Sequence, residues 1–315
     1  MYKKKKISFV IPVYNEQKLI LDTLRGIPKY VDRVYVVDDC STDNTASKVE
    51  FYSKKKDNRV RLISHQENQG PGQAIITGYL KSASDGYDIA VVCGGDNQMP
   101  LEQSNRLIDP LVRGEADYCK GNRFMHSNLE NMPITRIFGN SCLSFMTKIA
   151  SGYWHIFDTQ DGFTAISKNA IESIDWTKFW KGYGYPSDFL IQFNIYSLRV
   201  KEVPRRAIYL QGERQSQINT PKYMLKVGPM IVSGFFNRLY QKYVLRDFHP
   251  LIFFYLFGLT LLPLGLLVGA YILFYRMFFG SFTVATVILC ALLILLGAQS
   301  LFFAFLFDRE ASIGR

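Results

Sequence analysis

Two long apolar runs near the C-terminus constrain this chain more than any other feature. Residues 251–274 carry no charged side chain, and residues 282–307 form a second such run. At about 1.5 Å rise per residue, each run is long enough as a helix to cross a hydrocarbon core of roughly 30 Å. Buried core helices are the alternative, but they rarely extend this far without polar residues. The sequence therefore predicts a transmembrane hairpin with two spans.

The short link between the runs carries only Arg276, so both flanks of the hairpin are expected on one side of the membrane. Basic residues stand in both flanks, and basic flanks favour the cytoplasmic side: Arg238, Lys242, Arg246, Arg309 and Arg315. Residues 221–250 mix apolar with basic side chains and predict amphipathic helices at the membrane interface, with a plain surface helix as the alternative.

Residues 1–220 are polar and mixed, and they predict a separate domain in the cytoplasm. Strand patterns at 7–13, 34–37, 60–64, 89–93 and 116–120 alternate with helical patterns at 17–27, 45–53, 72–83 and 101–112. Such alternation is typical of an α/β fold with a doubly wound, mostly parallel sheet. Residues 221–250 and the hairpin of residues 251–315 follow this domain.

The charge and cysteine content exclude several protein classes. The formal net charge is +10, but the basic residues do not interleave with aromatic residues as in a nucleic-acid module. Solvated surface lysine accounts for about half of the charge, and a membrane surface or phosphorylated ligands for the rest. The five cysteines form no Cys-x-x-Cys pair, which argues against a disulfide framework or a zinc site. Two spans without internal charge also make a poor transport pathway.

Polar side chains follow three of the predicted strands at the point where each ends. They are Tyr14-Asn15-Glu16, Asp38-Asp39 and Asp96-Asn97-Gln98. Because parallel strands end at one edge of the sheet, we expect a ligand site there. Asp96 and Gln98 offer oxygen ligands to Mg²⁺ or Mn²⁺, which would bridge a diphosphate; a turn aspartate is the alternative.

Two further segments at this edge have both a binding and a structural interpretation. Asp38 and Asp39 can accept hydrogen bonds from a base or ribose, or can act in an N-cap or Asx turn. The run Asn68-Gln-Gly70-Pro-Gly72 opens a helix and lets backbone approach a ligand, although a glycine-rich loop alone is a weak signal.

A second group of residues supplies cations and donors. Arg123 follows a predicted strand, Arg136 and Asn140 share a helix face, and Arg214 lies in a polar stretch before the membrane-proximal region. The planar arginine fork suits phosphate; plain surface arginines are the alternative. Residues 158–163 place Asp158 and Asp161 beside a glycine turn.

Together these segments resemble the family 2 glycosyltransferases, and within them the dolichyl-phosphate-mannose synthase-like group. The matching pieces are residues 10–16, 36–45, 68–72, 95–99, 120–124 and 158–163, and the resemblance extends over about residues 7–220. It implies a GT-A fold and an inverting transfer of a hexose from a GDP-mannose or UDP-glucose type donor. The acceptor would be a polyprenyl phosphate at the cytoplasmic membrane face.

The resemblance also implies roles for individual residues. The nucleotide-sugar set comprises Pro12, Tyr14, Asn15, Glu16, Asp38, Asp39, Asn68, Gly70, Gly95 and Asp96. The lipid-phosphate set comprises Arg123, Arg136, Asn140 and Arg214, with Arg214 closing over the charged groups. Asp96 and Gln98 would hold the metal, and the catalytic residues would be Asp96, Arg123, Arg136 and Asp158. Hairpin-anchored chains can also pack through their spans, so a homo-oligomer is compatible with this reading.

Two positions depart from the family pattern. Gly94 replaces the first aspartate of the usual Asp-x-Asp motif, which predicts weaker metal binding, and Pro71 replaces a basic residue. A phosphate acceptor is already anionic and needs no strong base. A glycan hydroxyl acceptor would need one, with Asp158, Asp161 or Asp188 as candidates. A non-catalytic scaffold is the third alternative, for which Gly94 is the main support.

Overall fold

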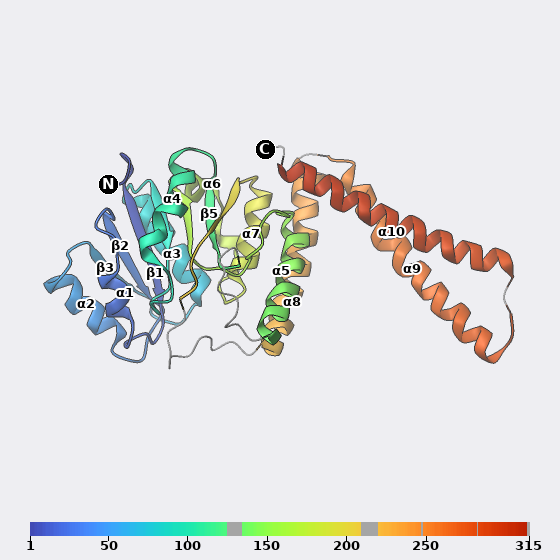
Figure 1. The fold of residues 1–315 in the computed structure, drawn as a ribbon, viewed down its shortest axis with the longest axis horizontal. Coiled ribbons are helices and arrows are strands. Elements are labelled where there is room, and N and C mark those ends of the chain that lie inside the picture. Colours follow the sequence, from blue (N-terminus) through green and yellow to red (C-terminus); the bar gives the residue numbers. More distant parts are fainter. Residues whose placement is uncertain (125–133, 209–219, 247, 282, 314–315) are drawn as a thin grey trace. The chain divides into compact units, whose positions relative to one another are not determined.

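A computed structural model describes residues 1–124, 134–208, 220–246, 248–281 and 283–313, without the side chains of 134–140, 220–222 and 312–313. The chain divides into two compact units, Met1–Gly234 and Phe235–Arg315. Figure 1 shows the strands and most helices in the first unit and a long helical pair in the second.

The first unit is built on a seven-stranded sheet in the order β3-β2-β1-β4-β6-β5-β7. Its strands are β1 Ile7–Val13, β2 Arg33–Asp38, β3 Val60–Ser64, β4 Ile89–Val92, β5 Tyr118–Asn122, β6 Thr164–Ser167 and β7 Val200–Pro204. Strand β6 runs antiparallel to both of its neighbours, whereas every other pairing is parallel. The predicted mostly parallel α/β sheet is confirmed.

Helices cover both faces of this sheet. The helices of the first unit before α8 are α1 Ile20–Arg25, α2 Thr45–Lys55, α3 Pro71–Ser84, η1 Leu101–Gln103, α4 Ser104–Val112, α5 Ile134–Ser151, α6 Lys168–Ser173, η3 Trp176–Lys178 and α7 Tyr185–Ile195. Phe9 and Ile11 of β1 pack into the core beside α1, α2 and α4, while Val10 packs into the core beside α3, α6 and α7. This alternation is the period of two expected of a strand buried on both faces.

Helix α1 begins three residues later than the sequence pattern predicts. The preceding residues are held by the start of α2 instead, because Glu16 N–H donates to Thr45 Oγ1 at 2.9 Å and Gln17 N–H donates to Asp43 Oδ2 at 3.2 Å. These two bonds hold the turn that follows β1, in which Asn15 has a φ of 57°.

The second unit contains the two apolar helices, α9 Leu251–Phe278 and α10 Val284–Ile313, both long enough and apolar enough to cross a membrane. They approach each other closely at glycines. A Cβ added at Gly258 would lie 2.5 Å from Leu301, and one added at Gly297 would lie 2.4 Å from the backbone of Leu262. Close backbone approach at small residues is how helices associate in lipid. The predicted hairpin is present, and it fits a membrane protein.

Helix α8, Thr220–Tyr240, continues through a π-helical turn, Gln241–Arg246, toward α9. At this junction Arg238 donates two hydrogen bonds to Asp308, at 2.9 and 2.8 Å. Tyr243 and Tyr255 donate to the same carboxylate at 2.6 and 3.2 Å. We call these four residues the hairpin joint. None of them is more than 1% exposed.

The hairpin joint changes the interpretation of two basic residues. The sequence placed Arg238 and Lys242 in a basic flank at the membrane surface, but both are buried. The physical reason is that Asp308 provides a carboxylate inside the protein, and a buried guanidinium with a bidentate partner is far less costly than one without. Arg246 and Arg309 are exposed.

We predict that Asp308→Ala destabilises the second unit by about 3–5 kcal/mol, because it leaves Arg238 buried without its carboxylate. Thermal unfolding of the full chain in detergent would measure this loss. The double variant Arg238→Met/Asp308→Leu removes both charges and should recover most of it. Asp22→Ala, at an exposed ion pair of α1, is the control and should change little. Equal melting of Asp308→Ala and the wild type would contradict the prediction.

Candidate active site

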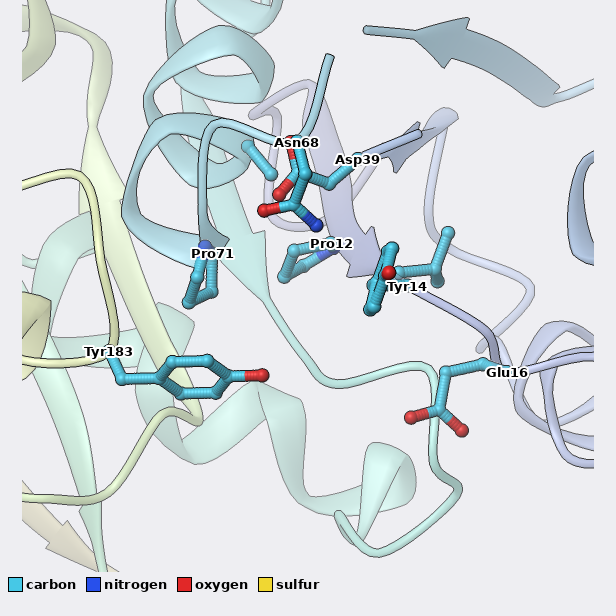
Figure 2. Close-up of a pocket in the computed structure, with 9 residues that line it drawn as sticks. Pro12, Tyr14, Glu16, Asp39, Asn68, Pro71 and Tyr183 are labelled. Atoms are coloured by element: carbon cyan, nitrogen blue, oxygen red, sulfur yellow. The ribbon is translucent and has the colours of Figure 1, made fainter. Parts of the chain in front are cut away.

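A cavity of about 430 Å³ opens where β1 and β2 end and α3 begins. Figure 2 shows its lining, which consists of Pro12, Val13, Tyr14, Glu16, Asp39, Asn68, Pro71, Ala74 and Tyr183. This volume lies within the range of small-molecule sites. The lining includes five of the residues predicted to hold a nucleotide-sugar: Pro12, Tyr14, Glu16, Asp39 and Asn68.

Asp39 is 3% exposed and joins the end of β2 to the turn before α3. Its Oδ1 accepts the Gln69 N–H at 2.9 Å and lies 2.8 Å from His65 Nδ1, and its Oδ2 accepts the Gly70 N–H at 2.7 Å. A carboxylate oxygen has two acceptor positions, so Oδ2 can still accept one bond from a ligand. His65 directly follows β3, and no motif in the sequence marks it.

Two predicted nucleotide residues hold the backbone of the neighbouring loop and are not part of the cavity lining. Asn15 Oδ1 accepts the Thr42 N–H at 2.8 Å. The Asp38 carboxylate accepts hydrogen bonds from the N–H and hydroxyl of Ser41. The turn interpretation therefore accounts for Asp38, because its carboxylate oxygens accept hydrogen bonds from Ser41, three residues further along the chain.

The glycines of residues 68–72 leave space for the backbone of residues 180–181. Gly70 has a φ of 92°, and a Cβ added there would lie 2.6 Å from the Lys181 carbonyl oxygen. A Cβ at Gly72 would lie 2.5 Å from the Trp180 carbonyl oxygen. The expected backbone approach to a ligand is thus an approach to residues 180–181. Gly95 likewise packs against Val13, at 2.6 Å from an added Cβ.

Asp96 follows β4 in a largely buried position, and its Oδ1 accepts the Gln98 N–H at 3.2 Å. Burial raises the pKa of Asp96, while backbone N–H groups and the charge of Arg205 oppose the rise. A Cβ added at Gly94 would lie 3.0 Å from Asp96 Oδ1, so the glycine leaves this space to the Asp96 carboxylate.

The residues around Asp96 fit a cation held mainly by its substrate. Within the described residues, no group of three His, Cys, Asp or Glu side chains gathers at one place. Asp96 and Gln98 can supply two oxygen ligands. Mg²⁺ is commonly bound by one or two carboxylates, with substrate phosphates and water completing its shell.

Two arginine–carboxylate pairs lie side by side near Asp96. Arg123 donates to both oxygens of Asp158, at 2.7 and 2.9 Å, and Arg205 donates to both oxygens of Asp161, at 2.6 and 3.1 Å. Arg123 Nε is also 4.0 Å from Asp161 Oδ2. We call these four residues the charge cluster. Arg205 belongs to no motif recognised in the sequence, and its place directly after β7 is its only signal.

Asp158, Asp161 and Arg205 of the charge cluster are buried, and Arg123 is partly exposed. Burial alone would raise the pKa of Asp161, but Arg205 and Arg123 outweigh it and hold that pKa at about 2. A Cβ added at Gly121 would lie 2.9 Å from Asp161 Oδ2, so only glycine fits beneath the pair. The side chain of Lys120 donates to the Asp158 carbonyl oxygen at 2.6 Å, which holds the same loop.

The remaining predicted site residues are placed only in part. Arg136 and Asn140 belong to α5, but their side chains lie outside the described residues, as does the whole of Arg214. Asp188, in the first turn of α7, is 5% exposed and accepts the Trp180 N–H at 2.7 Å. Burial raises the pKa of Asp188 from 3.8 to about 6.

We predict that Asp188 makes stability depend on pH between about 4 and 6. Its pKa is higher in the folded chain, so folding takes up a proton in this window and the free energy of unfolding falls as pH rises. Asp188→Asn removes that slope. Unfolding of both proteins in detergent at pH 4 to 7 would measure it, and parallel curves would contradict the prediction.

Comparison with known proteins agrees with this arrangement. Residues 8–175, more than half of the chain, match the model of Glycosyl transferase family 2. The UDP-N-acetylglucosamine–dolichyl-phosphate N-acetylglucosaminyltransferase of Methanococcus voltae is 34% identical over 220 residues, covering 66% of this chain and 87% of the relative. The polyprenol monophosphomannose synthase of Mycolicibacterium smegmatis is 26% identical over 244 residues, 73% and 88% of the two chains.

A solved structure shows the same fold. Glucosyl-3-phosphoglycerate synthase from Mycobacterium tuberculosis, in complex with Mn²⁺, UDP and its product, superposes with a TM-score of 0.54 at 18% identity. The match covers 75% of this chain and 80% of that one. The sheet, the position of the cavity and the family match agree: this chain belongs to glycosyl transferase family 2 and is a glycosyltransferase with a GT-A fold.

Proposed function

We propose that this glycosyltransferase moves a hexose from a nucleotide-sugar to a polyprenyl phosphate at the cytoplasmic face of a membrane. The donor would be of the GDP-mannose or UDP-glucose type, or carry N-acetylglucosamine as in the Methanococcus voltae relative. The observation that carries the proposal is the charge cluster near Asp96, which orients two arginines on two aspartates, in a chain with an apolar hairpin.

The donor nucleotide would occupy the cavity, with a ring or ribose donor bonded to Asp39 Oδ2. Its diphosphate would extend to Asp96 and Gln98, which would hold a divalent cation. That cation, when bound, neutralises the leaving diphosphate. Because a phosphate acceptor is already anionic, the chain's own task is to position it in line and surround it with cations.

Arg123 and Arg136 are the residues that we assign to the acceptor phosphate, with Asn140 and Arg214 assisting. Arg123 donates two hydrogen bonds to the Asp158 carboxylate, so Asp158 acts as the positioning residue for Arg123. The loop of the charge cluster borders the segment that follows β4, since a Cβ added at Gly162 would lie 3.6 Å from Met99. Acceptor and metal residues would thus act on one reaction centre.

A glycan hydroxyl acceptor, the alternative, requires a general base. Asp158 and Asp161 are poor candidates because arginines occupy both of their oxygens, and the pKa of Asp161 is about 2. Asp188 has a pKa of about 6, but it is buried and bonded to the Trp180 backbone. These contacts favour an acceptor that arrives already charged.

The membrane-facing region would bring the lipid acceptor to the site. Helix α8 exposes apolar side chains spaced by seven and four residues along one face: Leu225, Val232, Phe236 and Tyr240. Leu245 and Phe248 extend this exposed apolar series toward the hairpin. We propose that residues 221–250 lie in the interface plane. Arg246 and Arg309 flank the spans and support a cytoplasmic orientation.

The full chain in detergent, given labelled GDP-mannose, UDP-glucose or UDP-N-acetylglucosamine and a short polyprenyl phosphate, should form a lipid-extractable product. Mg²⁺ or Mn²⁺ should stimulate transfer, and a chelator should reduce it. Arg123→Ala and Arg136→Ala should each lower kcat/KM by about 100-fold, as expected for lost phosphate donors. Arg25→Ala, at an exposed pair of α1, is the matched control and should match the wild type.

A glycan hydroxyl acceptor predicts the opposite result, in which the aspartate variant is inactive and the arginine variants are active. If Asp188→Asn abolished turnover while Arg123→Ala and Arg136→Ala remained active, a hydroxyl acceptor would replace the phosphate. Absence of product with every donor, in membranes and in detergent, would defeat the proposal altogether.

We predict that Arg205→Met raises the KM for polyprenyl phosphate. Asp161 would lose its partner and, at 4.0 Å from Arg123 Nε, would draw Arg123 away from Asp158. In the double variant Asp161→Asn/Arg205→Met the competing charge is gone, so KM should return toward that of the wild type. Steady-state kinetics with varied acceptor would measure both. A double variant as impaired as Arg205→Met would show that Arg205 acts through packing alone.

A further inference from the structure

Tyr183 lines the cavity, although it lies in none of the motifs recognised in the sequence. It belongs to the loop between η3 and α7, far along the chain from the β1 and β2 ends. Its side chain is 58% exposed, so core packing does not explain a large aromatic ring at this position. Figure 2 shows the ring extending into the cavity from the side away from Glu16.

The backbone that carries Tyr183 is held at two points. Upstream, the Trp180 N–H donates to Asp188 Oδ2 at 2.7 Å. At Tyr183 itself, the carbonyl oxygen accepts the hydroxyl of Tyr223 from α8 at 3.3 Å. The loop is therefore fixed before a ligand arrives, and the ring needs little ordering on binding.

The same loop rests on the glycine turn before α3. The Gln73 N–H donates to the Lys181 carbonyl oxygen at 3.2 Å, and the lack of a Cβ at Gly70 permits this contact. Pro71, between the glycines, lines the cavity together with Tyr183. Pro71 contributes apolar ring atoms to the lining where the family pattern has a basic residue.

The cavity thus combines apolar walls with polar groups between them. Asp39 offers an acceptor, and the apolar part comprises Pro12, Val13, Pro71, Ala74 and the rings of Tyr14 and Tyr183. Partial desolvation of its hydroxyl in the cavity raises the pKa of Tyr183, and the nearby charges of Glu16 and Asp39 add to the rise. A flat ring with apolar faces and hydrogen-bonding edges fits such walls.

We propose that Tyr183 is a donor-binding residue whose ring stacks on the nucleobase of the nucleotide-sugar. The inference deepens the proposed function and rests on it. Stacking on an aromatic side chain tolerates any base, since every base has a π face. Tyr183 would therefore supply affinity, while Asp39 selects bases that present a donor on their edge.

The test compares binding of UDP and GDP to the full chain in detergent by titration calorimetry. Tyr183→Ala should weaken binding of the preferred nucleotide roughly 5- to 150-fold, the loss expected for one aromatic stack. Tyr183→Phe keeps the ring and should bind within about twofold of the wild type. Phe51→Ala, at an exposed aromatic residue of α2 outside the cavity, is the matched control and should bind like the wild type.

The outcomes separate the stacking role from the proposed function. Tyr183→Ala that binds as tightly as the wild type overturns the stacking role alone. Tyr183→Phe that loses as much as Tyr183→Ala also overturns it, because the hydroxyl and not the ring face would then carry the contact. A wild-type chain that binds neither nucleotide and transfers no sugar overturns the stacking role and the proposed function together.

Discussion

The site depends on the way the strands pair, because the pairing brings distant segments to one edge of the sheet. Strands β1, β2 and β4 run parallel and end together, which places the residues after them at that edge. Strand β6 runs the other way and pairs Thr164 with Val92, so the loop before β6 reaches the same edge as the end of β4. Strands β5 and β7 pair Asn122 with Pro204. The next residue of each strand's chain segment is an arginine, so Arg123 and Arg205 lie side by side.

Buried ion pairs then fix what the sheet brings together. In the charge cluster, each arginine uses two donors on one carboxylate, and this geometry orients loops as well as neutralising charge. The hairpin joint applies the same interaction in the second unit, with two tyrosine hydroxyls completing the shell of Asp308. Such pairs are costly to desolvate and costlier to break, so they hold one arrangement more than they add stability.

The glycines mark where segments of the protein approach each other. Because Gly70 and Gly72 have no Cβ, the carbonyl groups of residues 180–181 can approach them closely. Gly121 lies under the Asp161–Arg205 pair for the same reason. Gly94 leaves room for the Asp96 carboxylate, which remains the main metal-ligand candidate after β4. A site with one such carboxylate relies more on the donor's phosphates to retain a cation.

The sequence by itself determined the parts of this protein that follow from local pattern. The alternation of strands and helices, the two apolar spans and the polar residues at strand ends follow from hydrophobic periodicity and turn chemistry. They predicted the sheet, the hairpin and a ligand site at the strand ends, and the family resemblance assigned Tyr14, Asp39 and Asn68 to that site. Periodicity is carried by neighbouring residues, so no three-dimensional information was needed.

Only the tertiary structure decided which distant side chains meet. Arg205 pairs with Asp161 across 44 positions of sequence, and Arg238 pairs with Asp308 across 70. Tyr183 reaches the cavity only because residues 180–181 rest on the glycine turn before α3. The physical reason is that a charge or a ring has no local periodicity that reveals its partner. Burial and contact across the fold, which a linear pattern does not contain, give such residues their roles.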